Sequence, residues 1–400
     1  MIYNLSRPRK ILYVIRGVPW AEWTNSGFTR HLCISLKESG CLYGGINCDA
    51  LNGWELHGES FLCKQVRRVK RRIGVQPKRW SCERDGYLGR LLHSLPPQTP
   101  VVYHYILPEI DPSLSLRRFL FQDLSLYDAV RTQSYGHIGL TPEQVEQKAQ
   151  LLRRAYEQVE GILTYSTYAA DSLTRDFGFP RERITAIGCG PARSIGGIPT
   201  LERYEAGRIL FIGRRWEQKG GPILVKAFEI VHKALPHTTL HIVGPSCPPD
   251  DLIGKEGIRF HGLVDNKTLR LLFADSSMFV MPVICEAWGM VFTEALDAGL
   301  PIAGFNEWAL PDIVEDGQSG LLTSTISQEG LAEIMIEILN CPERMLRMAH
   351  HGQRRYREFL QWNHVRDRLL AHVLPEVVHE GIVKPLNSRI TTNEQEGITQ

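Results

Sequence analysis

Short apolar runs alternate with longer amphipathic segments along the whole chain. Helical periodicity fills many of the intervals, as in Gly221–Ala234 and Thr268–Ala274. Buried strands that alternate with helices predict parallel sheets with helices on both faces, the α/β class. The predicted strands are Ile11–Ile15, Val101–Tyr105, Phe119–Phe121, Gly161–Tyr165, Ile184–Ile187, Arg208–Ile212, Thr239–Val243, Ile258–Phe260, Met278–Met281 and Pro301–Ala303.

A length of 400 residues predicts two or three domains. The stretch 190–207 is rich in Gly and Pro and lacks apolar periodicity, which is typical of a linker. We therefore expect Rossmann-like domains over residues 1–195 and 196–360, and a helix over 361–379 that returns to the first domain. The segment 380–400 is polar with few aromatic residues, so we expect a disordered tail.

Composition changes this picture little. The chain is 43% hydrophobic and 22% charged, as soluble globular proteins are, and its formal charge of +2 gives no general signal for a polyanionic partner. The nine cysteines are odd in number and form no CxxC pair, which argues against a disulfide framework and a structural zinc site. No stretch reaches the roughly 20 apolar residues of a spanning helix, so we expect a cytoplasmic protein.

One segment carries concentrated charge. Lys64–Arg84 contains nine Lys and Arg residues and one Glu. Two interpretations stay open: a solvated basic face, or a contact with a phosphorylated acceptor or an acidic membrane surface. Nucleic acid is disfavoured, because neither a known binding fold nor an aromatic-interleaved surface accompanies the basic run.

The stretch Cys285–Pro301 is the most informative part of the sequence. It follows the predicted strand Met278–Met281, and in open α/β sheets ligands bind outside the carboxyl ends of strands. A turn leads into a helix from about Gly289, which puts Glu286 in the loop and Glu294 on the helix. The start of that helix offers unpaired N–H groups suited to an anion.

A ligand that carries both a diphosphate and sugar hydroxyls explains carboxylates beside an anion site. A second stretch, Ile212–Gly221, supplies cations at the end of another predicted strand. Arg214 offers a planar fork for phosphate oxygens, and Lys219 offers a mobile point charge. The stretch lacks the order of a Walker A loop. Each side chain taken alone is also compatible with an ordinary charged surface position.

These motifs together resemble a known family. Residues 208–322 are similar to the donor-binding half of retaining glycosyltransferases of the family-4 type (glycosyl transferases group 1), which have the GT-B fold. The E-x7-E element of that family matches Glu286 and Glu294, and its G-R-x4-K-G element matches residues 213–220. Shorter pieces match in the same order at Ile242–Gly244, Phe260–Gly262, Gly299–Pro301 and Asp316–Gly320.

The resemblance implies a role for each matching residue. Arg214 and Lys219 would hold the diphosphate, Glu294 the ribose hydroxyls, and Glu286 the sugar hydroxyls near the reacting carbon. The segment Phe260–Val264 would approach the base, largely through its backbone. The complete implied donor set is Gly213, Arg214, Lys219, Glu286, Ala287, Trp288, Gly289, Met290, Glu294, His261, Val264 and Gly27.

The first half of the chain matches more loosely. In the family, the loop after the first strand carries small residues, for which Ser26 and Gly27 are the candidates here. Many members have a histidine after the strand that here is Phe119–Phe121, where this chain has Gln122 followed by Asp123. The list of expected catalytic residues is Glu286, Arg214, Lys219, Gln122 and Asp123. The alternative is that His104 approaches from the neighbouring strand.

The resemblance implies two Rossmann-like domains that face each other across a cleft, with a C-terminal helix crossing back. It also implies transfer of a sugar from a nucleoside diphosphate to a saccharide or lipid-linked acceptor hydroxyl, with retention of configuration. We expect no metal and no cofactor beyond the nucleotide-sugar. Two alternatives stay open: a nucleotide-sugar-binding protein without turnover, and a nucleoside-diphosphate-sugar epimerase. A dinucleotide oxidoreductase is disfavoured, because no G-x-G-x-x-G follows the first strand.

Overall fold

The chain forms two compact units in a computed structural model of the protein. Unit 1 comprises Met1–Ala192 and Trp362–Val383, and unit 2 comprises Arg193–Gln361 and Lys384–Gln400. The described residues are 9–22, 24–48, 86–105, 111–133, 139–252, 254–377 and 386. The basic segment 64–84 therefore lies outside the described residues, as does the expected tail apart from Leu386.

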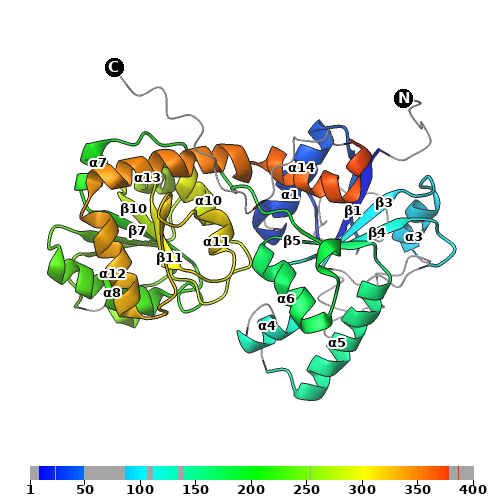
Figure 1. The fold of residues 1–400 in the computed structure, drawn as a ribbon, viewed down its shortest axis with the longest axis horizontal. Helices are drawn as coiled ribbons and strands as arrows, with labels where there is room; N and C mark the ends of the chain where they lie inside the picture. Colours follow the sequence, from blue (N-terminus) through cyan, green and yellow to red (C-terminus); the bar gives the residue numbers. More distant parts are fainter. Residues whose placement is uncertain are drawn as a thin grey trace. The chain divides into compact units, whose positions relative to one another are not determined.

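Unit 1 is built on a parallel sheet in the order β2-β1-β3-β4-β5-β6 (Figure 1). Its central strands are buried along their whole length, as expected for a sheet covered on both faces. The strands are β1 (Ile11–Ile15), β2 (Leu42–Asn47), β3 (Pro100–His104), β4 (Arg117–Gln122), β5 (Gly161–Thr164) and β6 (Ile184–Ala186).

The helices of unit 1 include one from the far end of the chain. α14 (Trp362–Val373) packs on α1 and β6: Ser35 donates to the carbonyl of Trp362, and Arg368 donates to the carbonyl of Ile187 at 2.8 Å. The other helical elements are η1 (Thr24–Gly27), α1 (Phe28–Glu38), α3 (Gly86–His93), α4 (Leu126–Arg131), α5 (Pro142–Glu157), α6 (Thr167–Phe177), η3 (Arg181–Arg183) and η6 (Pro375–Val377).

A second parallel sheet, in the order β12-β11-β10-β7-β8-β9, forms the centre of unit 2. Its strands are β7 (Arg208–Ile212), β8 (Thr239–Val243), β9 (Ile258–Gly262), β10 (Met278–Val280), β11 (Ile302–Phe305) and β12 (Gly320–Thr323). The predicted fold class, α/β with two Rossmann-like parallel sheets, is confirmed.

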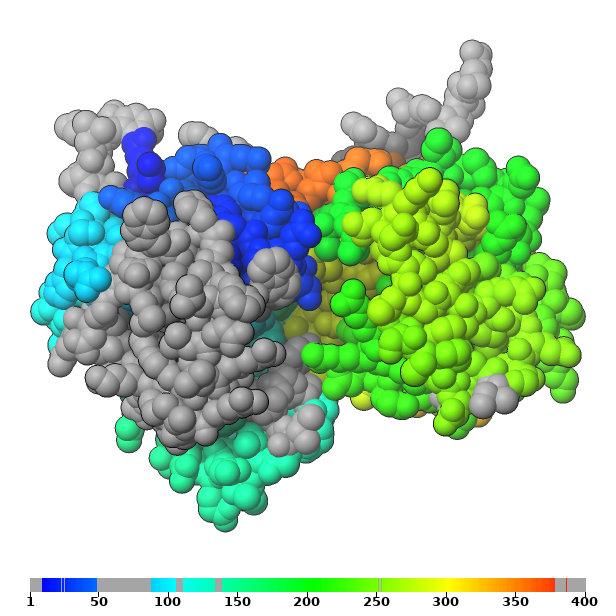
Figure 2. Space-filling model, turned by 180° about the vertical axis from the view of Figure 1, so that it is seen from behind, coloured from blue at the N-terminus to red at the C-terminus, as the bar shows by residue number. Residues whose placement is uncertain are grey.

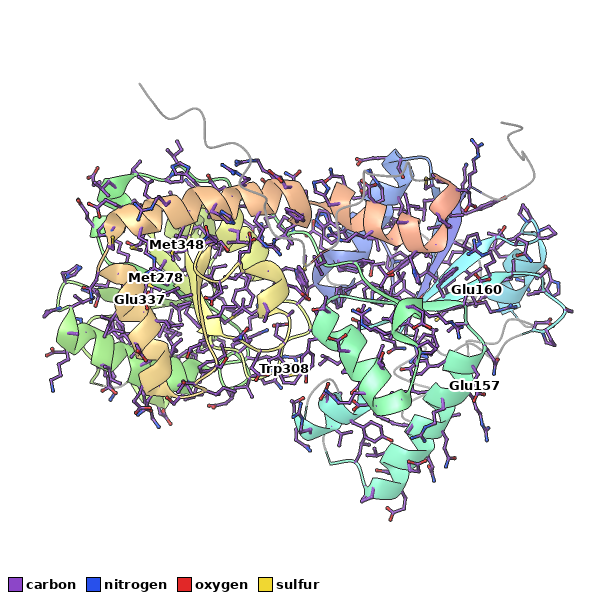
Figure 3. The ribbon with its side chains drawn as sticks, viewed as in Figure 1. Glu157, Glu160, Met278, Trp308, Glu337 and Met348 are labelled. Carbon is purple, nitrogen blue, oxygen red and sulfur yellow. The ribbon has the colours of Figure 1, made fainter. Side chains whose placement is uncertain are left out.

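Helices cover the second sheet, and α8 and α12 lie side by side (Figure 1). Met278 of β10 and Met348 of α13 lie in the buried core, as Figure 3 shows. In the view from behind in Figure 2, the green to yellow-green atoms are the surface of unit 2. The helical elements are α7 (Leu201–Glu205), α8 (Gly221–Ala234), η4 (Asp250–Leu252), α9 (Asn266–Asp275), α10 (Met290–Asp297), α11 (Leu310–Ile313), α12 (Gln328–Leu339), α13 (Pro342–Arg355) and the π-helical turn η5 (Tyr356–Leu360). None of the described helices is long and apolar enough to cross a bilayer.

The expected linker over 190–207 is wrong for part of its length. Residues 201–205 form α7, which is anchored to the rest of unit 2. The hydroxyl of Tyr204 is buried and donates to the carbonyl of Gly299 at 2.7 Å, and Arg203 donates to three backbone carbonyls. One turn of helix is too short to show apolar periodicity, so the sequence pattern could not reveal it.

Two strands, β2 and β12, were not predicted, and both contain glycines at points of close approach. A Cβ at Gly45 of β2 would lie 3.0 Å from the Pro19 side chain and 3.2 Å from the Cys33 sulfur. A Cβ at Gly320 of β12 would collide with the carbonyl of Ile302 on the neighbouring strand. Glycine weakens the apolar pattern by which strands are predicted, although here it permits the packing.

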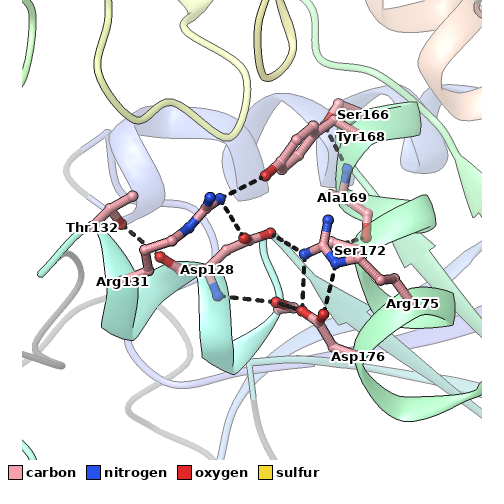
Figure 4. Close-up of polar contacts among 10 residues, drawn as sticks. Asp128, Arg131, Thr132, Ser166, Tyr168, Ala169, Ser172, Arg175 and Asp176 are labelled. Atoms are coloured by element: carbon pink, nitrogen blue, oxygen red, sulfur yellow. Dashed lines mark hydrogen bonds and ion pairs between the residues drawn. The ribbon is translucent and has the colours of Figure 1, made fainter.

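A network of ion pairs joins α4 to α6 in unit 1 (Figure 4). The carboxylate of Asp128 is 3% exposed and accepts from Arg131 at 2.8 Å and from Arg175 at 3.1 Å. The two guanidinium groups are more than half exposed, so water screens them and only the carboxylate is desolvated. Figure 4 also shows Tyr168 and Asp176 completing the network.

We expect Asp128→Asn to lower the free energy of unfolding by about 1–3 kcal/mol, because the buried negative charge is lost and an NH2 donor replaces one of the two acceptor oxygens. Urea denaturation measures this change. Asp171 is the matched control, since its ion pair with Arg181 is largely exposed and Asp171→Asn should change stability by less than about 1 kcal/mol. Equal effects of the two substitutions would contradict the importance of burial.

Candidate functional site

The candidate site lies where the strand order of unit 2 reverses. From β7 the chain continues to β8 and β9 on one side, and it then returns to place β10 on the other side of β7. The loops that follow β7 and β10 therefore leave the same edge of the sheet in opposite directions. A crevice outside the carboxyl ends of strands at such a point is where open α/β sheets bind ligands.

Glycine at position 220 lets these two loops touch. Gly220 precedes α8 with a φ of +74°, and a Cβ there would collide with the carbonyl oxygen of Pro282 in the loop after β10. The backbone N–H of Ile284 donates to the carbonyl of Gln218 at 3.1 Å, which joins the same two loops. Side chains from the loops after β7 and β10 are therefore brought together at one point.

Lys219 and Glu286 form an ion pair between these loops. Their side chains are 22% and 11% exposed, respectively. The stem of Lys219 lies over Gly213, where a Cβ would be only 2.9 Å from the Cβ of the lysine. Burial lowers the pKa of Lys219 to about 8, and the nearby charge of Arg215 adds to this effect. An ammonium and a carboxylate thus lie side by side at the edge of the sheet.

The start of α10 contributes partial positive charge to the same loop. Gly289 precedes the helix with a φ of +79° and, because it has no side chain, provides no side-chain cap for the first turn. The helix dipole and its N–H groups therefore favour an anion there. The indole N–H of Trp288 is also buried, and it has no hydrogen-bond partner in the part of the chain that the structure describes. Such an orphaned donor is unusual in a folded interior and fits a site that a ligand or water completes.

Glu294 lies further along α10 and is almost fully buried, with 3% of its surface exposed. Its carboxylate accepts from the guanidinium of Arg193 at 3.3 Å and from the backbone N–H of the same residue. Burial raises the pKa of Glu294 to about 7, whereas Arg193 and the more distant Arg270 act in the opposite direction. Sequence reasoning did not identify Arg193, because its partner is 101 positions away and no local motif marks it.

The remaining predicted residues of unit 2 divide into two groups. Arg214 is exposed directly after Gly213 at the end of β7. Ala287 and Trp288 are buried in the loop after β10, where Met290 is half-buried as the first residue of α10.

The imidazole of His261, by contrast, stacks on His241 of β8, with Nε2 lying 3.0 Å from Nδ1 of that residue. His261 therefore contacts β8, the strand next to β9. Val264 lies two residues beyond the end of β9 and is half-buried.

The predicted residues of unit 1 lie directly before α1, in the connection that follows β1, and at the carboxyl end of β4. Gly27 adopts a φ of +89° before α1, and Asp123 follows Gln122, the last residue of β4. Burial raises the pKa of Asp123 to about 6, against the effect of hydrogen bonds from the Leu124 N–H and from Tyr105.

The alternative histidine of unit 1, His104, is a core residue. Its side chain is completely buried, and Nδ1 lies 2.8 Å from the hydroxyl of Tyr13. Burial lowers the pKa of this imidazole to about 3, so it stays neutral. Phe28 and Phe121 pack against the ring, which fixes it within the sheet and α1.

The chain is similar to known glycosyltransferases. Residues 206–341 match the model of the family described as Glycosyl transferases group 1. The O-antigen chain mannosyltransferase B of Escherichia coli is 27% identical over 210 residues, which are 47% of this chain and 54% of that protein. The chain spans little more than half the length of curated relatives such as this one.

Solved structures show the same fold. WaaG, a glycosyltransferase involved in lipopolysaccharide biosynthesis, is 16% identical and superposes with a TM-score of 0.60, covering 91% of this chain and 99% of WaaG. HepE of Anabaena, solved in complex with UDP, is 14% identical with a TM-score of 0.59, covering 92% of this chain and 100% of HepE. The architecture is therefore GT-B.

We expect Gly220→Ala to lower stability by more than about 2 kcal/mol and to disrupt the candidate site, because both the positive φ and the Pro282 carbonyl oppose a Cβ. The matched control is Gly317→Ala. Gly317 has a φ of +78°, and a Cβ there would meet no atom within 4 Å among the described residues. Gly317→Ala therefore measures only the cost of a positive φ for alanine, a loss of about 1 kcal/mol in the free energy of unfolding. Thermal unfolding measures both variants, and equal losses would contradict the loop contact.

Proposed function

We propose that the protein is a glycosyltransferase that moves a sugar from a nucleoside diphosphate to an acceptor hydroxyl with retention of configuration. The observation that carries this proposal is the pair of Lys219 and Glu286 at the strand reversal of unit 2. A cation for phosphate oxygens and a carboxylate for hydroxyls lie together, as the junction between a diphosphate and a sugar requires. The family match over residues 206–341 and the mannosyltransferase relative support the same class.

Each group then has a distinct task toward the donor. Lys219, the exposed Arg214 and the uncapped start of α10 bind the diphosphate. Glu286 accepts hydrogen bonds from sugar hydroxyls, and Glu294 accepts them from the ribose. Ala287, Trp288, Gly289 and Met290 form the wall beside the phosphate and sugar, and His261 and Val264 lie on the base side.

Charge stabilisation is the main requirement of the reaction. The bond between the anomeric carbon and the diphosphate oxygen breaks while a bond to the acceptor oxygen forms on the same face, and the departing phosphate oxygen takes the proton of the acceptor hydroxyl. Preorganised cations at the leaving group contribute about 3–4 kcal/mol each to such a step. We propose that Arg214, Lys219 and the helix end supply this charge without a metal ion, which activity in excess EDTA tests.

Unit 1 is proposed to bind the acceptor through the carboxyl ends of its strands, with Gly27, Gln122 and Asp123 as contacts. The acceptor is a saccharide or a lipid-linked saccharide. The basic segment 64–84 would support docking on an acidic membrane surface. The names of the relatives, which include an O-antigen chain mannosyltransferase, fit glycan biosynthesis.

A thermal-shift panel of UDP-, GDP- and ADP-sugars tests donor binding. A ligand at about 100 times its dissociation constant should stabilise the protein by roughly 2.7 kcal/mol. We expect Lys219→Ala to abolish this shift, because the diphosphate loses its buried cation. Lys226→Ala is the control, since this lysine is exposed on α8. An unchanged shift in the Lys219 variant would contradict the phosphate role.

Turnover separates the transferase from a protein that only binds nucleotide-sugars. We expect release of nucleoside diphosphate in a mixed acceptor extract, with a loss of about 100-fold or more in Glu286→Ala. Donor binding without release in the wild type would favour the binding protein. Analysis of the sugar product distinguishes transfer from epimerisation.

Donor affinity should depend on pH in a predictable direction. Glu294 acts as a carboxylate and has a pKa of about 7 without ligand, so affinity falls as the pH drops below that value. Lys219 acts as an ammonium with a pKa of about 8, so affinity also falls as the pH rises above it. Calorimetric titration should find a maximum between these values. Glu294→Gln should flatten only the acidic side, and a change on the basic side alone would contradict the assignment.

A further inference from the structure

The position of the Arg193 backbone is set by the residues that follow it in the chain. It is the first residue of unit 2, and the three residues after it are fastened to Asp297 near the end of α10. The Asp297 carboxylate accepts from the hydroxyl of Ser194 at 3.1 Å and from the backbone N–H groups of Ile195 and Gly196 at 2.7 and 3.0 Å. Asp297 lies about one turn beyond Glu294 on the same helix, so this anchor brings Arg193 to that carboxylate.

The contact between Arg193 and Glu294 is asymmetric. The glutamate side chain is 4% exposed, whereas the arginine side chain is 39% exposed. A carboxylate this deeply buried is unstable as an anion unless donors compensate for the water that it has lost. Arg193 provides two such donors, its backbone N–H and its guanidinium at 3.3 Å.

We propose that Arg193 is a positioning residue for donor binding, which holds the Glu294 carboxylate ionised and oriented for the hydroxyls of the nucleotide ribose. This inference rests on the proposed function, because it assumes that Glu294 contacts the donor. Arg193 itself needs no contact with the ligand, so its effect passes through Glu294.

The charges around Glu294 come from several elements. Arg193 precedes α7, Arg270 projects from α9, and Tyr356 lies in the π-helical turn η5. β11, which also packs on α10, is Ile302–Phe305 and contains no ionisable side chain. Burial raises the pKa of Glu294 to about 7, and Arg193 is the strongest of the groups that oppose this rise. Removal of its guanidinium should therefore raise the pKa further.

Removal of the Arg193 guanidinium should weaken donor binding at neutral pH and have little effect at alkaline pH. A higher pKa leaves less carboxylate at neutral pH, so the variant binds the donor more weakly there than the wild type does. As the pH rises, Glu294 ionises in both proteins and their affinities converge. Loss of Lys219 charge above about pH 8 affects both proteins equally, so the ratio of the two affinities is the informative quantity.

The experiment compares dissociation constants for UDP and GDP from about pH 6 to about pH 9 by calorimetry. Arg193→Met should weaken binding of the preferred nucleotide by roughly two- to fivefold at pH 7, if the pKa of Glu294 rises from about 7 by about half a unit to one unit. The ratio to wild type should approach one at the alkaline end. Arg193→Lys keeps a charge beside Glu294 and should restore most of the affinity.

Arg208→Met is the matched control. Arg208 is exposed at the amino end of β7, away from the carboxyl edge that carries the site, and its substitution should leave the affinity ratio near one at every pH. Thermal unfolding without nucleotide reports any loss of folding. Arg193→Gln replaces the methionine variant if that variant does not fold.

A ratio for Arg193→Met that is the same at every pH would overturn the proposal, because a purely structural role predicts a constant loss. Glu294→Gln separates this failure from failure of the proposed function. If Glu294→Gln binds nucleotide as tightly as the wild type, the ribose role of Glu294 is itself wrong. If Glu294→Gln binds weakly while the Arg193 ratio stays constant, only the role of Arg193 is wrong.

Discussion

The contact between the loops after β7 and β10 is the constraint on which the candidate site depends. Gly220 is required there twice, for its positive φ and for the approach of the Pro282 carbonyl. Without that approach, Lys219 and Glu286 would extend into solvent from separate loops, and their attraction would be weak. The contact instead shields both charges from water, which strengthens the effect of each on any ligand.

Shielding these charges from water costs free energy, which makes their burial informative about function. Desolvation of an ion pair can exceed the attraction that it gains, so a partly buried pair is weak support for stability. Lys219 shows the penalty in its lowered pKa, and Glu294 shows it in a raised one. Charged residues that are buried at a cost in desolvation free energy, at the carboxyl edge of an open sheet, are candidates for ligand binding. The buried N–H of Trp288 belongs to the same category.

Much of the sheet could be predicted from the sequence, because buried parallel strands are continuous apolar runs. β1, β7 and β8 begin and end at the predicted residues, as does α8. Local patterns also placed both halves of the candidate site at strand ends. They could not reveal contacts set by tertiary structure. Arg193 reaches Glu294 only through the folded unit, and the stacking of His261 on His241 depends on the register of β8 and β9.

The ion pair also suggests why the site would favour a donor that still carries its sugar. A diphosphate that binds Lys219 must compete with Glu286 for the ammonium. The displaced carboxylate then needs new donors, because a desolvated anion without them is unfavourable. Sugar hydroxyls attached to the same phosphate supply those donors at the required place, whereas a bare nucleoside diphosphate does not. The exchange of partners would thus couple recognition of the phosphate to recognition of the sugar, through one contact that already exists without ligand.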